Sequence, residues 1–159
     1  MYLRAEIISE KNLIGKSIKT SFVNDRTVDL WKSFMPRRKE ILNSKSNDLL
    51  SLQIYDENFF NNFNPNSEFE KWALIEVSNF ENIPENMEAF TLQEGLYAVF
   101  IHKNAISTPD KTFKYIYEIW IPNSEYELDN RPYFEVLGEK YKNKDISSEE
   151  EICIPIRLR

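Results

Sequence analysis

The sequence is poor in the residues on which metal centres and many active sites are built. Its 159 residues include one cysteine, Cys153, one histidine, His102, and three glycines. A single cysteine excludes an intrachain disulfide and any zinc site built on several cysteines. Three glycines leave no phosphate-cradling loop, and neither an HExxH nor an EF-hand pattern occurs. We therefore expect no metal and no cofactor.

The two rare residues have ordinary structural interpretations. His102 follows an expected strand and precedes Lys103, and the chain has no G-x-S-x-G turn to supply a serine nucleophile. We expect His102 to be a surface residue or a hydrogen-bonded one, not a catalytic base. Cys153 is expected to be a small packing residue and not a reactive thiol.

Positive charge and long apolar runs are also scarce. Lysine and arginine number 20 against 26 acidic residues, which gives a net charge of −6. Binding to nucleic-acid phosphates needs a basic surface, so no direct nucleic-acid partner is expected. No apolar run approaches 18 residues and the N-terminus has no signal-peptide core, so we expect a cytoplasmic protein without membrane contact. The acidic balance mildly favours cations.

Aromatic and aliphatic residues are abundant. Hydrophobic residues make up 42% and aromatic residues 14% of the chain, which is typical of a folded domain. A length of 159 residues fits one domain, so residues 1–159 are expected to form a single unit with its own core.

Hydrophobic periodicity predicts an α+β order of elements. Apolar residues at helical spacing predict one helix before Pro36 and a second between Thr108 and Pro122, where Thr108, Pro109 and Asp110 are start signals. Alternating patterns predict strands in 3–20, 50–55, 69–77, 87–92, 96–102, 126–128, 133–137 and 152–158.

Glycine and proline refine these expectations. Gly15 suggests a bulge in the first strand, and Gln93-Glu94-Gly95 predicts a hairpin between two strands. Pro155 cannot donate a ladder hydrogen bond, so the last strand is expected at a sheet edge or with a bulge. Residues 138–148 are polar and are expected to form an exposed loop.

The element order repeats as strand, helix, strand, strand. The simplest solution lays two helices on one face of an antiparallel sheet, with the two halves side by side and a groove between them. Each half contributes a helix with one tryptophan, Trp31 or Trp120.

A carboxylate interrupts the apolar strand Tyr133 to Leu137. Tyr133, Glu135 and Leu137 share one face of that strand because side chains alternate. A charge on a covered apolar face is costly unless it has a partner. We interpret Glu135 as the counter-charge of a ligand.

The aromatic residues suggest the chemistry of that ligand. Most large aromatic residues pack in cores, but Trp72 and Tyr133 each share a strand face with a carboxylate, Glu76 and Glu135. Rings beside a carboxylate suit an organic cation, since the ring quadrupole attracts it and the carboxylate neutralises it. An exposed surface residue is the expected role of Glu76. The predicted ligand-binding residues are Glu135, Trp72, Tyr133, Tyr97, Trp120 and Tyr55.

Several motifs in the last 70 residues resemble the effector-binding domains of the AraC and gyrase-inhibitor-like superfamily. They are Trp120-Ile121-Pro122, Asn123 to Leu128, Pro132 to Glu135, and Ile152 to Ile156. Leu137 departs from the pattern, since the family often has tyrosine there. The resemblance implies two strand-helix-strand-strand units with pseudo-two-fold symmetry, a ligand groove between them, and an acidic residue at the Glu135 position facing the groove.

The resemblance leaves the activity open. It implies a stand-alone bacterial binding domain for hydrophobic, cationic or aromatic ligands, related to transcription-regulating drug sensors. A subset of the superfamily resembles hydrolases of electrophilic small molecules, and here Glu135 with Tyr97 or Tyr133 would form the acid/base pair. Another branch resembles inhibitors that bind gyrase through an acidic surface, which would imply a protein partner.

Overall fold

A computed structural model describes residues 1–104, 109–138 and 148–159 of the chain. The helical segments in these ranges are α1 (Thr27–Phe34), the 3-10 turn η1 (Met35–Glu40), α2 (Pro109–Tyr115), the π-helical turn η2 (Ile116–Trp120) and α3 (Ile121–Asn123). The strands in these ranges are β1 (Tyr2–Ile8), β2 (Lys11–Thr20), β3 (Leu49–Ile54), β4 (Phe69–Val77), β5 (Glu88–Leu92), β6 (Gly95–Lys103), β7 (Tyr126–Leu128), β8 (Tyr133–Leu137) and β9 (Glu149–Leu158).

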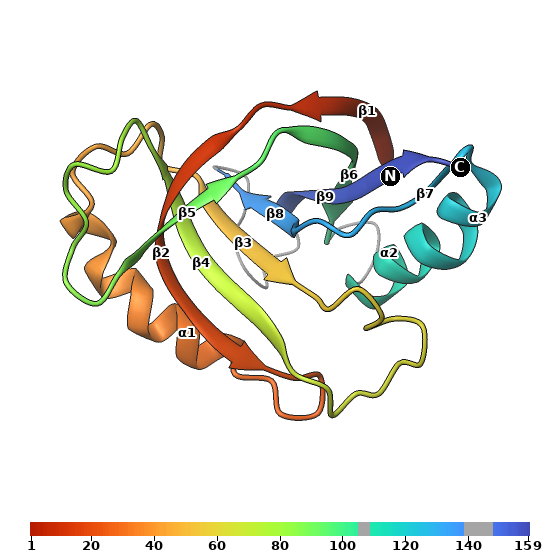
Figure 1. Cartoon of the computed structure of the whole chain (residues 1–159), viewed down its shortest axis with the longest axis horizontal. Coiled ribbons are helices and arrows are strands. Elements are labelled where there is room, and N and C mark those ends of the chain that lie inside the picture. The colour runs from red at the N-terminus through yellow and green to blue at the C-terminus, as the bar shows by residue number, and fades with distance from the viewer. Residues whose placement is uncertain (105–108, 139–147) are drawn as a thin grey trace.

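The strand order is symmetric about its centre. The path β1-β6-β9-β8-β3-β4-β2-β5 is antiparallel throughout, and β7 pairs with β9 outside this path. One unit is β2-α1-β3-β4 and the other is β6-α2-β8-β9, and they join where β3 pairs with β8. The helices α1 and α2 lie at opposite ends of the molecule (Figure 1). The predicted α+β fold of two β-α-β-β units is confirmed.

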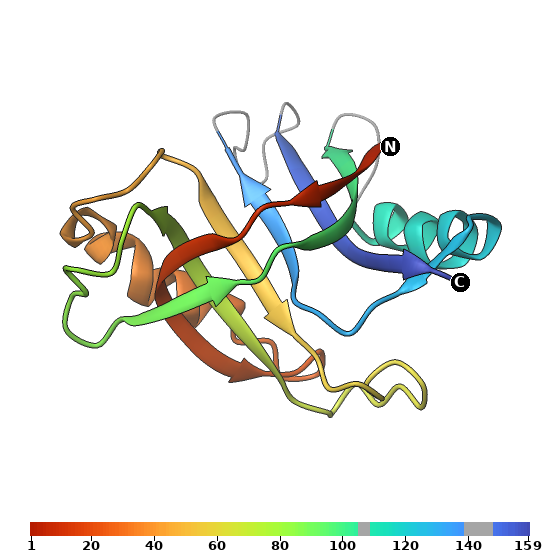
Figure 2. The same ribbon diagram turned by 45° about the horizontal axis from the view of Figure 1, so that its top comes forward.

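A second connection between the units runs along β1-β2 and β5-β6. Ile8 pairs with Gly95 and Lys11 with Leu92. The same antiparallel register therefore continues across the break between β1 and β2 and across the break between β5 and β6. The two long strands run side by side across the molecule (Figure 2). The predicted hairpin between β5 and β6 is therefore wrong: Gln93 and Glu94 form no turn, and each flanking strand pairs with β1 or β2 instead of with its neighbour in sequence.

The curled sheet separates three hydrophobic clusters. All the main strands contribute to an inner cluster, which includes Leu13, Leu52, Trp72, Tyr97 and Phe134. The opposite face of each unit packs on its helix. The α1 cluster is Ile14, Leu30, Phe34, Ile41, Ala73, Ile75, Val77 and Met87, and the α2 cluster is Ala98, Phe100, Ile116, Ile121, Tyr133, Ile152, Ile154 and Ile156.

Two local predictions fail for reasons that the sheet explains. Gly15 pairs with Leu74 in a register without a shift, so it forms no bulge. A Cβ there would lie 1.8 Å from the Ala73 carbonyl oxygen, so glycine is needed for close approach of the backbones. β9 is not an edge strand, because it lies between β6 and β8. Pro155 falls between Cys153, where pairing with β8 ends, and Ile156, where pairing with β7 begins.

Parts of two predictions lie outside the described residues. The structure describes the second helix from Pro109, but not Thr108, its predicted capping residue. Residues 139–147 of the expected polar loop are also outside the described ranges. Within those ranges, no helix has the length and apolar character needed to cross a membrane.

Candidate functional site

Two adjoining cavities lie on the helix-bearing face, along the line where the units meet. The first has a volume of about 350 Å³ and is bounded by the start of α1, by α2 and η2, and by strands β3, β4, β8 and β9. The second has a volume of about 680 Å³ and follows α1 and η1. Thr27, Lys71 and Glu135 line both cavities, so the two volumes share a boundary.

The first cavity has an aromatic wall. Tyr55 meets Tyr133 edge to face, with ring centroids 5.2 Å apart, and Phe60 stacks on Tyr117 at 6.2 Å. Phe60 comes from the asparagine-rich segment between β3 and β4, so this segment bridges the first unit and the helix of the second. The aromatic residues of the lining are Phe22, Tyr55, Phe60, Phe69, Phe113, Tyr117, Tyr133 and Phe134.

Glu135 lies at the centre of this face. It pairs with Ser51 of β3 on one side and Ile152 of β9 on the other. Phe134 and Val136, its neighbours on β8, point into the inner cluster, so alternation directs Glu135 to the helix-bearing face. The side chain keeps some accessible surface because it borders both cavities.

The surroundings of Glu135 favour its neutral form. Burial, followed by repulsion from Glu150, raises its pKa from 4.5 to about 7, and Lys71 partly offsets this by attraction. Burial also raises the pKa of Glu150. Among the residues that the structure describes, none forms a hydrogen bond or a salt bridge within 4.0 Å of the Glu135 carboxylate. An acid of this kind gains a partner when a cation enters the cavity.

Lys71 is the cation at the boundary of the two cavities. Its side chain leaves β4 on the same face as Glu135, and Gln53 of β3 lies directly opposite it. Its charge lowers the pKa of Glu135, Glu150 and Asp25 without a salt bridge to any described residue. The groove formed by the two cavities therefore carries charges of both signs, and acidic residues are in excess.

The tyrosines of the wall are held neutral. Burial, and then the nearby charge of Glu135, raises the pKa of Tyr55 above its ordinary value. Burial has the same effect on the pKa of Tyr117, and it raises the pKa of Tyr133 to about 12. The wall thus offers ring faces and neutral hydroxyl groups, and the charge in the first cavity is left to Glu135, Lys71 and Asp25.

The second cavity is largely apolar along its length. Its aliphatic and aromatic lining comes from α1, η1 and the ends of β3 and β8, and consists of Val28, Trp31, Met35, Pro36, Leu49 and Leu137. Glu150 and Lys32 supply further charges. This cavity therefore extends the aromatic one with a surface suited to an apolar chain.

The structure brings together three of the six predicted ligand-binding residues. Glu135, Tyr133 and Tyr55 line the first cavity. Trp72 points into the inner cluster on the other face of the sheet, where its ring lies 5.2 Å from that of Phe90. Trp120 belongs to the α2 cluster and packs on Tyr2 and Phe100, at 4.8 and 5.1 Å.

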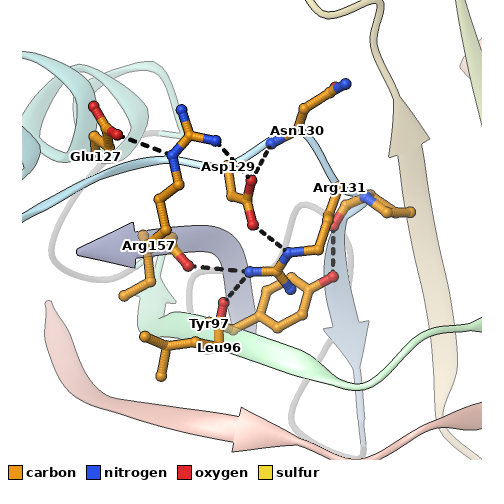
Figure 3. A network of polar contacts seen from close by, with 9 residues as sticks. Leu96, Tyr97, Glu127, Asp129, Asn130, Arg131 and Arg157 are labelled. Carbon is orange, nitrogen blue, oxygen red and sulfur yellow. Dashed lines mark hydrogen bonds and ion pairs between the residues drawn. The ribbon is translucent and has the colours of Figure 1, made fainter. Parts of the chain in front are cut away.

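Tyr97 also lies away from the groove, in a polar network within the second unit (Figure 3). Its hydroxyl donates to the Pro132 carbonyl oxygen at 2.8 Å, and the Arg131 guanidinium lies 4.8 Å from its ring centroid. Arg131 also donates to the carbonyl oxygens of Leu96 and Ile156, at 2.6 and 3.1 Å. This network joins β6 and β9 to the segment before β8.

Sequence reasoning missed most of the groove lining, including Lys71, Phe22, Phe60 and Tyr117. Lys71 alternates with apolar residues on β4, just as Glu135 does on β8, and this pattern was a usable signal. Phe22 and Phe60 come from loops, where no periodic pattern places a side chain at the cavity, and Tyr117 lies on the apolar stripe of the expected second helix.

The other residues considered as candidates, His102, Cys153 and Glu76, make ordinary structural contacts. His102 is buried, and its ring nitrogens lie 2.7 Å from Thr112 Oγ1 and 2.8 Å from Asn104 Oδ1. Cys153 is buried in the inner cluster, and burial raises the pKa of its thiol. Glu76 lies 3.5 Å from Lys11 Nζ and 3.9 Å from Lys45 Nζ, away from both cavities.

Comparison with known proteins gives the family. Residues 8–156 match the Cass2 family, which is described as "Integron-associated effector binding protein". The chain belongs to this family. It is an effector-binding domain, and it is also 28% identical over 146 residues to the transcriptional regulator BrlR of Pseudomonas aeruginosa. That match covers 91% of the chain and 52% of BrlR, so the chain spans about half the length of this relative.

Two solved structures share the fold of this chain. SAV2435, solved bound to tetraphenylphosphonium, is 16% identical with a TM-score of 0.64, and the match covers 99% of this chain and 94% of that one. An integron cassette protein from the mobile metagenome of Vibrio cholerae is 18% identical with a TM-score of 0.65, and the match covers 97% and 95% of the two chains. Both confirm the α+β fold expected from the sequence.

Proposed function

We propose that the groove binds hydrophobic organic cations and that Glu135 is the residue that neutralises them. The observation that carries this proposal is the Glu135 carboxylate at the boundary of two cavities, raised in pKa and without a salt bridge to any described residue. A lipophilic cation would favour the ionised carboxylate and bury its apolar surface against the rings.

The aromatic wall supports the same ligand class. Tyr55, Tyr117, Tyr133 and Phe60 place ring surfaces beside the acid, and rings attract a cation within about 6 Å of their centroid. The tetraphenylphosphonium bound by SAV2435 is a cation of this class, which adds support by analogy of fold. As part of a regulator, such a domain would couple ligand binding to transcription.

The test compares two carboxylates of the same chain. Tetraphenylphosphonium is titrated by calorimetry at pH 8 into the wild-type protein, Glu135→Gln and Glu76→Gln, and circular dichroism checks each fold. Glu135→Gln is expected to weaken binding by about 10- to 100-fold, since a charge-assisted contact contributes roughly 1.5–3 kcal/mol. Glu76→Gln removes the same charge outside the groove and is expected to change the affinity less than threefold. Equal affinity of the wild type and Glu135→Gln would overturn the proposal.

A second candidate function is acid/base hydrolysis of an electrophilic ligand. It is favoured by the pKa of about 7 at Glu135, which suits proton transfer at neutral pH, and by the neutral hydroxyl of Tyr133 on the same wall. Tyr97, the other tyrosine considered for this role, donates its hydroxyl to Pro132 on the opposite face. Mass spectrometry of epoxide-bearing ligands after incubation tests it: turnover abolished by Glu135→Gln supports hydrolysis, and intact ligand contradicts it.

A further inference from the structure

The two cavities together form a site with two parts. They share Thr27, Lys71 and Glu135. On one side of these residues the lining of the first cavity is aromatic, and on the other side the apolar lining of the second cavity is largely aliphatic. The first cavity, about 350 Å³, contains the aromatic wall, and the second, about 680 Å³, runs beside α1. A compact cation seated on the aromatic wall leaves the second volume unfilled.

We propose that the second cavity is a subsite for an aliphatic chain, so that the preferred ligands are amphiphiles with a cationic aromatic head and an alkyl tail. The inference rests on the proposed function, because the head is held by Glu135. Val28, Met35, Leu49 and Leu137 give the tail an apolar surface that begins where the head ends. Transfer of each CH2 group from water to such a surface is favourable.

The positions of the charges fix the orientation of the amphiphile. Glu135 stands at the shared boundary and faces the rings of Tyr55 and Tyr133 in the first cavity. Beyond this boundary the second cavity adds one acid, Glu150, and one cation, Lys32, so it offers no excess negative charge. The head is therefore placed on the aromatic side, and an uncharged tail crosses beside Thr27 toward Trp31.

The test is a chain-length series. Methyl-, butyl-, hexyl- and octyl-triphenylphosphonium are titrated below their micelle-forming concentrations. The affinity of the wild-type protein is expected to rise about threefold to fourfold per added CH2 until the cavity is filled. The double variant Val28→Asn/Met35→Asn makes the tail subsite polar, and it is expected to flatten this rise while leaving the methyl compound unaffected.

Leu42→Asn is the matched control. Leu42 is 77% exposed and lines neither cavity, whereas Val28 is 63% exposed and lines the second. The control is expected to keep the full dependence on chain length. Fluorotryptophan labelling adds a direct readout, since the ¹⁹F resonance of Trp31 is expected to move only with tailed ligands. The resonance of Trp72, on the opposite face of the sheet, is the internal reference.

The outcomes separate this inference from the proposed function. If the methyl compound binds through Glu135 but tails add no affinity, or add it without affecting the double variant or the Trp31 signal, the tail subsite is refuted and the cation site stands. If no member of the series binds the wild-type protein, or if Glu135→Gln binds the methyl compound equally well, the proposed function fails first.

Discussion

At the scale of single residues, the buried Glu135 carboxylate lowers the stability of the ligand-free protein. Its folded pKa of about 7 lies above the 4.5 of a free glutamate, so the folded protein holds a proton more tightly than the unfolded chain does. The free energy of unfolding therefore falls as the pH rises from 4.5 to 7, and the full penalty is present above pH 7.

Glu135→Gln removes this penalty. The variant is expected to be more stable than the wild type above pH 7, by up to about 3 kcal/mol, and to match it near pH 4. Urea unfolding at pH 4.5, 6 and 8 measures the difference. Since the pKa of Glu150 is raised as well, Glu150→Gln should shift stability in the same direction. A Glu135→Gln variant less stable than wild type at pH 8 would mean that the carboxylate has a stabilising partner.

The positive charge of Lys71 lowers the affinity of the groove for cationic ligands. Lys71→Met removes a positive charge from the boundary of the cavities, so affinity for tetraphenylphosphonium should rise on the order of tenfold. The titration is made at pH 8.5, where Glu135 stays ionised despite losing the attraction of Lys71. Lys19→Met, an exposed position with the same change in net charge, is the control. An unchanged affinity in Lys71→Met would place the ligand's charge elsewhere.

The sequence reveals the acid of the groove but not most of its walls. Alternation on β8 is enough to isolate Glu135 and Tyr133 on one face, because a strand has a fixed period of two. Alternation cannot say which side chains of β4 or β6 lie on the same side of the sheet as Glu135. Trp72 and Tyr97 were predicted as ligand-binding residues, but the structure places them in the inner cluster, and only sheet pairing determines that.

At the scale of elements, the segment between β3 and β4 supplies two rings of the first cavity, Tyr55 and Phe60, and leaves another phenylalanine ring outside it. Phe60 lines the first cavity and is 41% exposed, whereas Phe63, three residues on, is 50% exposed and lines neither cavity. Phe60→Ala should weaken tetraphenylphosphonium binding by about tenfold through the loss of ring contact, and Phe63→Ala by less than threefold. Parallel titrations measure both. Equal losses would assign the effect to the segment's conformation.

Close packing of β2 on β4 gives a second prediction. Gly15→Ala places a Cβ 1.8 Å from the backbone oxygen of Ala73, so the strands must separate. We expect a loss of about 1–3 kcal/mol in urea unfolding, typical of overpacking. Gly138→Ala meets only the Asp48 side chain, at 3.2 Å, and should cost little, because that side chain can move. A neutral Gly15→Ala would contradict the close approach.

Most elements are predictable from the sequence, but their pairing is not. The strands and the helix α1 follow from local periodicity. The hairpin expected at 93–95 is absent because β5 and β6 pair with β1-β2 instead, and these partners lie more than 70 residues away in the sequence. The same limit applies to Pro155, whose place between the partners β8 and β7 depends on strands that no local pattern identifies.

At the scale of the whole molecule, the two units are joined twice, through β3-β8 and through the ladder of β1-β2 with β5-β6. The groove lies over the first joint, so ligand binding acts across both units. We expect one cooperative unfolding transition, with ligand raising its midpoint in proportion to the logarithm of concentration. Differential scanning calorimetry checks this, and two separate transitions would contradict it.

The central claim is that an organic cation binds beside Glu135 in the groove and drives its protonated carboxyl group to ionise. The number of protons released on binding tests this claim most directly. Calorimetric titration of tetraphenylphosphonium at pH 6.5, in two buffers with different ionisation enthalpies, measures that number. With a free-protein pKa of about 7, Glu135 should release about 0.75 of a proton when the cation binds. Glu135→Gln should release almost none. Tight binding to the wild-type protein without proton release would contradict the claim.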